Sequence, residues 1–193
     1  AESVEYVVVN SLQEEVDYPL STEGQSVAYT NYSGDGGVGI GSFFRRLGFA
    51  LRYGELNLLI SNQLSDDSKL IMERNIVSRV KKAAPFLYTD NDPYLALVEG
   101  DLFWIIDMYT VSDKYPYAQP ADTRRINENS GLPLNFNYLR NSVKAVVNAY
   151  DGTLNFYVVD ETDPLISTYE DIFPNLFSPK SSMNTELLDH IRY

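Results

Sequence analysis

One aspartate in this chain, Asp107, has the setting of a catalytic carboxyl group. Asp107 directly follows the apolar run 104–106, and burial in such surroundings raises the pKa of a carboxyl group. General acids use this setting, usually with a second carboxylate nearby. Asp90, Asp101 and Asp113 are the candidate partners of Asp107. The alternative is a structural carboxylate bonded to backbone groups or to an arginine.

The segment Asp90-Asn91-Asp92 resembles the beginning of a calcium-binding loop. Tyr94 stands at the fifth position, however, and the sixth lacks the glycine that the loop requires. An Asx turn that leads through Asp92-Pro93 into a strand explains the same residues. We therefore expect no dedicated cofactor, with adventitious calcium on Asp90 and Asp92 as the alternative.

Tyrosines gather around one long polar segment, and they could line a groove for a peptide or a glycan, because tyrosine combines apolar area with a polar tip. The alternative is that they pack this segment onto a sheet. The tyrosines are Tyr109, Tyr115, Tyr117 and Tyr138.

Two further motifs lack residues that their chemistry needs. The glycine-rich stretch 33–42 has neither the spacing of a dinucleotide fingerprint nor the lysine of a P-loop. It predicts a close backbone approach followed by a helix capped by Ser42. His190 is the only histidine, and no GxSxG motif accompanies it. Its position suits the C-terminus of a short helix.

The composition excludes several classes of protein. A net charge of −12 opposes binding to nucleic acid and to anionic lipid head groups. The absence of cysteine excludes disulfides, a cysteine nucleophile and zinc sites with thiolate ligands. No apolar run approaches the roughly 20 residues that span a bilayer, and Glu2 and Glu5 stand where a secretory signal would be basic. With 44% apolar residues, we expect a soluble piece with a packed core.

The order of elements predicts an α+β fold, in which antiparallel β-hairpins pack with two to four α-helices. Expected strands are 5–10, 27–32, 94–98 and 102–110, with a hairpin over 142–160; expected helices are 43–53, 65–84, 164–173 and 185–191. We expect one soluble domain over 1–193, with lobes 1–90 and 91–193 as the alternative. The polar connection 112–141 is long enough to be an ordered excursion or a functional segment.

The hairpin over 142–160 makes the most specific local prediction. A two-residue type I′ turn at Asp151-Gly152 would place Val147 opposite Phe156. One face then collects only apolar residues, whereas the other carries Lys144 and Asn148, either solvated or hydrogen-bonded to a neighbouring element.

A series of short segments links the chain to a known family. In order these are DYP (17–19), GGV within the glycine stretch, FRRLGFALRYGELNLLIS (44–61), APFL (84–87), DPY (92–94), WIIDMYT (104–110), YPY (115–117), NYLRNSVKAVVNAYDG (137–152), DP (163–164), FP (173–174) and HIRY (190–193). The series covers nearly the whole chain and resembles uncharacterised protein family 0182. Asn148 and Asn184 depart from its pattern, which commonly has an acid and a proline there.

The resemblance implies a cellular setting but no reaction. It implies a large bacterial protein with several predicted membrane spans followed by a long soluble region. The chain would then be an excised extracytoplasmic part, periplasmic or extracellular, of a protein of the cell membrane.

Three functions follow as hypotheses. The first is a non-catalytic extracytoplasmic module for assembly or for recognition of a protein or envelope ligand, joined to the membrane through parts outside this chain. The second is an envelope hydrolase that uses Asp107 with Asp90 or Asp92. The third is a calcium-stabilised binding module around Asp90 and Asp92.

Overall fold

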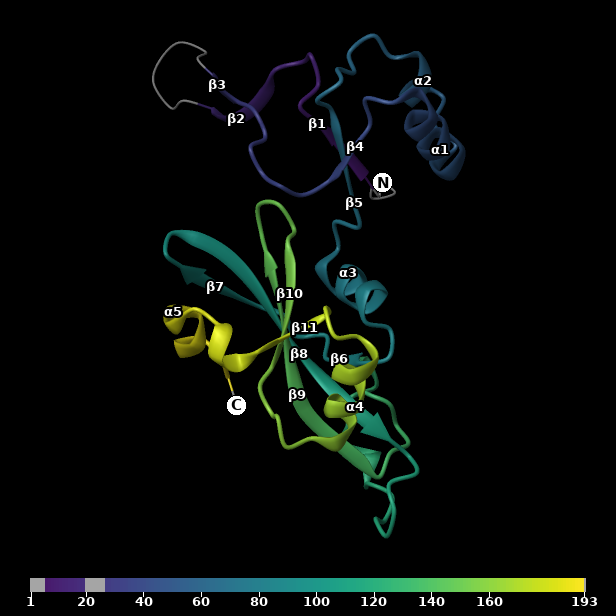
Figure 1. Cartoon of the computed structure of the whole chain (residues 1–193), viewed down its shortest axis with the longest axis vertical. Coiled ribbons are helices and arrows are strands. Elements are labelled where there is room, and N and C mark those ends of the chain that lie inside the picture. Colours follow the sequence, from purple (N-terminus) through teal and green to yellow (C-terminus); the bar gives the residue numbers. More distant parts are fainter. Residues whose placement is uncertain (1–5, 20–26, 193) are drawn as a thin grey trace. The chain divides into compact units, whose positions relative to one another are not determined.

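The computed structural model describes residues 6–19 and 27–192, so Glu2 and Glu5 lie outside the described residues. The chain divides into two compact units, unit 1 over residues 1–74 and unit 2 over residues 75–193 (Figure 1). The boundary precedes residue 90, where the alternative of two lobes placed it, because helix α3 (Ile76–Ala83) contributes Val80 to the core of unit 2. In the described ranges no helix has the length and apolar character needed to cross a membrane.

Unit 1 combines small antiparallel sheets with two helices. Its central sheet has the order β1-β5-β4, and β2 and β3 form a separate hairpin. The bounds are β1 (Tyr6–Val9), β2 (Glu15–Pro19), β3 (Val27–Thr30), β4 (Val38–Gly39), α1 (Phe43–Tyr53), α2 (Asn57–Ile60) and β5 (Lys69–Met72). Ile40, Ala50, Leu58 and Leu70 are buried together as its core.

The prediction of one helix over 65–84 is wrong in its first half. Residues 69–72 instead form β5, whose Met72 lies opposite Tyr6 of β1. Glu73 then has a φ of 53°, which does not continue a right-handed helix. Helix α3 begins only after Asn75, whose side chain accepts the Ser78 N–H at 2.9 Å. Apolar spacing over 72–83 imitated a helix, whereas pairing with a strand more than sixty residues earlier decided the structure.

Unit 2 is built on one larger sheet with the order β11-β10-β9-β8-β6, and β7 also pairs with β8 (Figure 1). The bounds are β6 (Tyr88–Thr89), β7 (Tyr94–Val98), β8 (Asp101–Ser112), β9 (Tyr138–Asn148), β10 (Leu154–Val158), α4 (Pro164–Ile172), β11 (Phe177–Pro179) and α5 (Thr185–Asp189), with 3-10 turns at Thr123–Arg125, Glu128–Ser130 and Lys180–Ser182. Strands β10 and β11 are parallel and the other pairs are antiparallel. The α+β prediction is confirmed. The structure describes five helices where two to four were expected, and two of the five, α2 and α5, are only about one turn long.

The centre of this sheet is buried on both faces. On one face Ile106, Val143 and Ala145 pack with Val80 of α3 and Ile166 of α4. On the other, Ile105 and Val146 pack with Leu187 of α5. Side chains alternate between the faces, so residues 105–108 of β8 and 143–147 of β9 lie inside the protein whichever way they point.

The β9–β10 hairpin has the predicted faces but a different turn. Val147 lies opposite Leu154, a shift of two residues from the predicted pairing, which keeps each side chain on its predicted face. The Asn148 side chain accepts the N–H groups of Tyr150 and Asp151 at 2.8 and 3.2 Å. It thereby stabilises a longer loop, in which only Gly152 has a positive φ. The type I′ prediction at Asp151-Gly152 is therefore wrong.

A two-residue turn with positive φ at both positions does occur, in the β7–β8 hairpin. Val98 lies opposite Asp101, and the intervening Glu99 and Gly100 have φ of 53° and 93°. These are the signs that a type I′ turn requires. The predicted hairpin over 94–110 is thus confirmed. The connection that follows it covers 113–137, which is shorter than the predicted 112–141 because both flanking strands extend into it.

Candidate functional site

A buried ion pair joins the two central strands of unit 2. The register of β8 and β9 places Asp107 opposite Lys144. Lys144 Nζ donates to Asp107 Oδ1 at 2.6 Å, with the two side chains 0% and 6% exposed. Asn141 Nδ2 donates to the other carboxylate oxygen at 3.2 Å, and Lys144 Nζ also donates to the Arg192 carbonyl oxygen at 3.1 Å. Asp107 is therefore held by a lysine and an amide, whereas we expected an arginine or backbone groups in the structural alternative.

Asp90 is linked through its backbone to Asp107 of this pair. Its backbone N–H donates to the Asp107 carbonyl oxygen at 3.2 Å. Burial, followed by the negative charge of Asp107, raises the pKa of Asp90 to about 6, against smaller opposing effects of the Asp92 N–H and Lys144. A carboxyl group with this pKa can donate or accept a proton near neutral pH.

Two acceptor atoms in this cluster are buried without a hydrogen-bond partner in the described part of the chain. They are Oδ1 of Asp90 and Oδ1 of Asn141. A protonated Asp90 would carry a donor where the ionised form has only acceptors. A buried carboxylate oxygen without a donor disfavours the ionised form, which agrees with the raised pKa of Asp90.

The other proposed partners of Asp107 lie elsewhere. Asp101 begins β8 and Asp113 follows its end. Each is six residues from Asp107, which corresponds to about 20 Å along a strand. They are not part of the cluster.

The ionisation of Asp90 predicts a pH-dependent effect of Asp90→Asn. Because the folded-state pKa is raised, the wild-type carboxyl favours folding below its unfolded value near 3.9, and this contribution is lost as the pH rises through about 6. Urea unfolding should show the variant gaining about 1–2 kcal/mol relative to wild type between pH 4 and pH 7.5, after allowance for partial exposure. A difference in the free energy of unfolding between variant and wild type that stayed constant across this pH range would contradict the raised pKa.

A second polar cluster centres on Asp163, which is fully buried. Thr110 Oγ1 and Ser142 Oγ donate to its Oδ2, both at 2.5 Å. The Tyr138 hydroxyl donates to Oδ1 at 2.6 Å, and the Leu165 N–H donates to Oδ1 at 2.9 Å. Burial alone would raise the pKa of Asp163, but these four hydrogen bonds hold it below its usual value.

This cluster is structural. Asp163 occupies the N-cap of α4 with proline following it, as predicted. In addition it joins β8 and β9 to that helix, a role that the local pattern Asp-Pro does not reveal. Burial and the hydrogen bond to Asp163 raise the pKa of Tyr138, so this hydroxyl stays protonated at physiological pH.

The four tyrosines proposed as a groove have different environments. Tyr115 stacks on Tyr138 with ring centroids 4.4 Å apart. Tyr117 is fully exposed, with a φ of 59°, and Tyr109 lies opposite Tyr88 in the sheet. The groove for a peptide or glycan stays a prediction, with Tyr115 and Tyr138 as its adjacent pair.

At the proposed calcium site, the central amide is already used by the protein. Asn91 Oδ1 lies 3.3 Å from the Lys81 ammonium, and its Nδ2 donates to the Asn129 carbonyl oxygen at 2.7 Å. Within residues 6–19 and 27–192 no three acidic or histidine side chains are grouped to hold a metal ion. Calcium on Asp90 and Asp92 stays a prediction without added support.

The remaining motifs have structural positions. A Cβ atom on Gly41 would lie 2.6 Å from the Asp66 carbonyl oxygen, so this glycine permits the close backbone approach that we predicted. Ser42 is the N-cap of α1, but its side chain makes no capping hydrogen bond. His190 ends α5, with Nε2 3.2 Å from the Leu97 carbonyl oxygen.

Sequence reasoning did not identify Lys144 as the partner of Asp107. The available signal was one charge of each sign inside two long apolar strands, at 102–110 and 143–147. Such isolated charges have to be paired when both faces of a sheet are covered. The covering helix α5 lies about forty residues further along the chain, beyond the reach of a local pattern.

Comparison with known proteins agrees with the resemblance noted in the sequence. Relatives named UPF0182 protein are 46% identical over 191 residues in Pelotomaculum thermopropionicum and 48% over 188 in Trichodesmium erythraeum. These alignments cover 99% and 93% of this chain but 19% and 20% of the relatives, so the chain spans about a fifth of their length. No solved structure matches the chain. The model of the Uncharacterised protein family (UPF0182) matches residues 1–193, and the chain therefore belongs to this family.

Proposed function

We propose that residues 1–193 form a non-catalytic extracytoplasmic module that takes part in the assembly of a larger membrane protein. The observation that carries this proposal is an apolar surface on α1 and α2 of unit 1, named here the α1–α2 surface. It consists of Phe43 (62% exposed), Phe44 (80%), Leu51 (75%), Leu56 (70%) and Ile60 (72%).

The α1–α2 surface has the character of an interface. Phe43, Phe44 and Leu51 lie within one arc of about 100° on α1, given the 3.6-residue period. The Phe43 and Phe44 rings contact edge to face, with centroids 5.9 Å apart. Contiguous apolar patches on a protein surface generally mark an interaction site.

We propose the rest of the same polypeptide as the partner of the α1–α2 surface. The relatives carry about four-fifths of their length outside the matched region, which is ample to cover five apolar side chains.

The buried charges of unit 2 support a structural role for that unit. Asp107 is bound by Lys144, and Asp163 is bound by three hydroxyl groups and a backbone N–H.

Substitutions on this surface should act differently in the chain and in the whole protein. In the 193-residue chain, Phe44→Ser and Leu51→Ser should change the free energy of unfolding by less than about 0.5 kcal/mol, since both side chains are exposed. In the full-length protein, each should cost about 1.5–3 kcal/mol if the side chain is buried there. Denaturant unfolding of both proteins measures the difference.

The matched control is Asn62→Ser, an exposed polar position in unit 1. This variant should change neither protein. Equal effects of Phe44→Ser in the chain and in the full-length protein would contradict the assembly role.

A second candidate function rests on the proximity of Asp90 to Asp107. In this reading Asp90, with a pKa of about 6, acts as the general acid of a hydrolase. Incubation of the chain with chromogenic glycosides and esters tests it: turnover that Asp90→Asn abolishes would support this function, and no turnover of any of them would count against it.

A further inference from the structure

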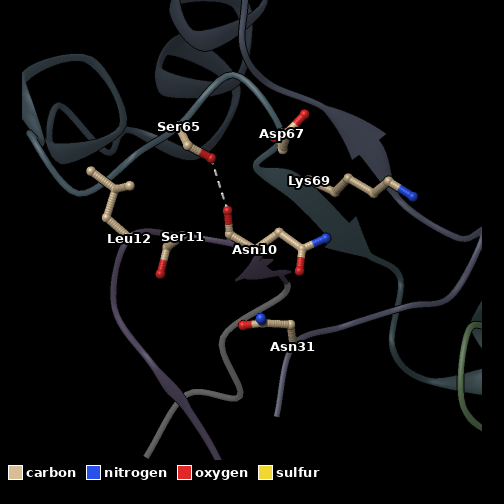
Figure 2. Close-up of a pocket in the computed structure, with 7 residues that line it drawn as sticks. All are labelled: Asn10, Ser11, Leu12, Asn31, Ser65, Asp67 and Lys69. Carbon is tan, nitrogen blue, oxygen red and sulfur yellow. Dashed lines mark hydrogen bonds between the residues drawn. The ribbon is translucent and has the colours of Figure 1, made fainter.

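A polar cavity of about 550 Å³ lies within unit 1, well apart in sequence from the carboxylate cluster. Its lining comes from the end of β1 and the following turn, the segment after β3, and the segment leading into β5 (Figure 2). The lining residues are Asn10, Ser11, Leu12, Asn31, Ser65, Asp67 and Lys69. Its volume falls in the range of small-molecule sites, roughly 300–1,000 Å³.

Two amide side chains in the lining are not used by the fold. Those of Asn10 and Asn31 form no hydrogen bond with another residue in the described ranges. Figure 2 shows the two amides on neighbouring segments, with no labelled side chain between them. Each amide offers two N–H donors and one carbonyl acceptor, so together they can bind groups that both donate and accept hydrogen bonds.

The carboxylate of Glu15 links the two segments that carry these amides. Glu15 Oε1 accepts the Asn10 N–H at 2.6 Å, and Glu15 Oε2 accepts the Tyr32 N–H at 3.1 Å. Glu15 thus links the residue that carries one amide to the neighbour of the residue that carries the other. This arrangement sets the spacing of the amides before any ligand arrives, which lowers the entropic cost of binding.

Two serine hydroxyl groups also bind the backbone of Asn10. Its carbonyl oxygen accepts the hydroxyl groups of Ser65 and Ser68 at 3.0 and 2.9 Å. Its φ is 54°, a left-handed conformation that asparagine tolerates better than most residues. These contacts involve the backbone of Asn10 and leave its amide for the cavity.

The charges of the lining indicate an uncharged ligand. Asp67 and Lys69 have opposite signs, and the Lys69 ammonium already donates to the Gly34 carbonyl oxygen at 3.0 Å and lies 5.7 Å from the Tyr32 ring centroid. The lining therefore has no net charge that would favour an anion or a cation. The Ser11 and Ser65 hydroxyl groups already donate to the Gln13 and Asn10 carbonyl oxygens. The uncharged groups that remain are the two amides, which can pair with neighbouring hydroxyl groups of a sugar or polyol.

We propose that this cavity binds an uncharged, hydroxyl-rich ligand of the size of a mono- or disaccharide, with Asn10 and Asn31 as binding residues and Glu15 as a positioning residue. The site is separate from the α1–α2 surface, and it adds ligand recognition to the proposed assembly role without depending on it.

Titration of the ¹⁵N-labelled 193-residue chain with trehalose, N-acetylglucosamine and myo-inositol tests the proposal by NMR. We expect saturable shifts of the Asn10 and Asn31 side-chain amide signals with at least one of these probes. Asn31→Ala should weaken that binding about tenfold, as expected for one or two lost hydrogen bonds. Asn31 is exposed, so this variant should keep its fold. Asn62→Ala, an exposed asparagine outside the cavity, should bind like wild type.

Glu15→Ala distinguishes positioning from direct contact. It should weaken binding while broadening or moving the Asn10 and Tyr32 backbone signals in the absence of a probe, whereas Asn31→Ala should leave those backbone signals in place. The proposal would be overturned if no uncharged probe moved the two amide signals, if only glutamate or inorganic phosphate moved them, or if Asn62→Ala weakened binding as much as Asn31→Ala.

Discussion

Lys144→Met is expected to lower the free energy of unfolding by about 3–5 kcal/mol, the range for breaking a buried ion pair by removing one partner. Methionine fills most of the volume of lysine, so the main effect is an Asp107 carboxylate left inside the sheet without its cation. The Asn141 amide remains as a hydrogen-bond donor to Asp107, but it carries no compensating charge. Urea unfolding at pH 7 measures the loss.

A double variant separates the loss of charge balance from the loss of packing. Asp107→Leu combined with Lys144→Met replaces the pair by apolar side chains in the same cross-strand register. Such replacements are often neutral or stabilising, so the double variant should recover most of the stability that Lys144→Met loses. A double variant as unstable as the sum of the two single variants would contradict the account of this pair as a mutually compensated structural element.

Asp163→Ala should cost about 3 kcal/mol or more, because it removes the N-cap of α4 and leaves buried hydroxyl groups without an acceptor. The effect should depend on pH. Since the folded-state pKa of Asp163 is lowered, its stabilisation is present above the unfolded value near 3.9 and is lost as the pH falls through the folded value. The difference between variant and wild type should therefore narrow below about pH 4.

Asp160→Ala is the matched control for this variant. Asp160 lies three residues earlier and pairs with Arg140 at 3.2 Å, with both side chains about a third exposed. A pair of this kind contributes roughly 0–1 kcal/mol. Thermal or denaturant unfolding that gave equal losses for the two variants would contradict the central role of Asp163.

The sequence predicts those features of unit 2 that depend on neighbouring residues. The faces of β9 and β10 follow from alternation alone, and the start of α4 follows from Asp163-Pro164. The turn at 149–152 was mispredicted because the Asn148 side chain competes with the two-residue turn that Asp-Gly favours.

Features that depend on contacts between residues far apart in the sequence could not be predicted from local patterns. Residues 69–72 become a strand because β1 lies beside them, and Lys144 is buried because the apolar cluster around α5 covers its face of the sheet. The same limit applies to the cavity in unit 1. Its two amides are separated by about twenty residues and are brought together by Glu15, so no short motif marks the site.

The α1–α2 surface is the feature on which the proposed assembly role depends. Exposed phenylalanines at 43 and 44 have no role in the core of unit 1, whose apolar residues include Ile40, Ala50 and Leu70. Leu51 and Ile60 add to the same surface. A protein about five times longer than this chain can bury such a surface without any second protein.

Thiol labelling at residue 44 tests this claim most directly, since the chain contains no cysteine. Phe44→Cys and the control Asn62→Cys would be labelled with a maleimide in the 193-residue chain and in a full-length protein freed of other cysteines. The assembly role predicts equally fast labelling of both positions in the chain, and in the full-length protein slow labelling at 44 with fast labelling at 62. Equally fast labelling of both positions in the full-length protein would contradict it.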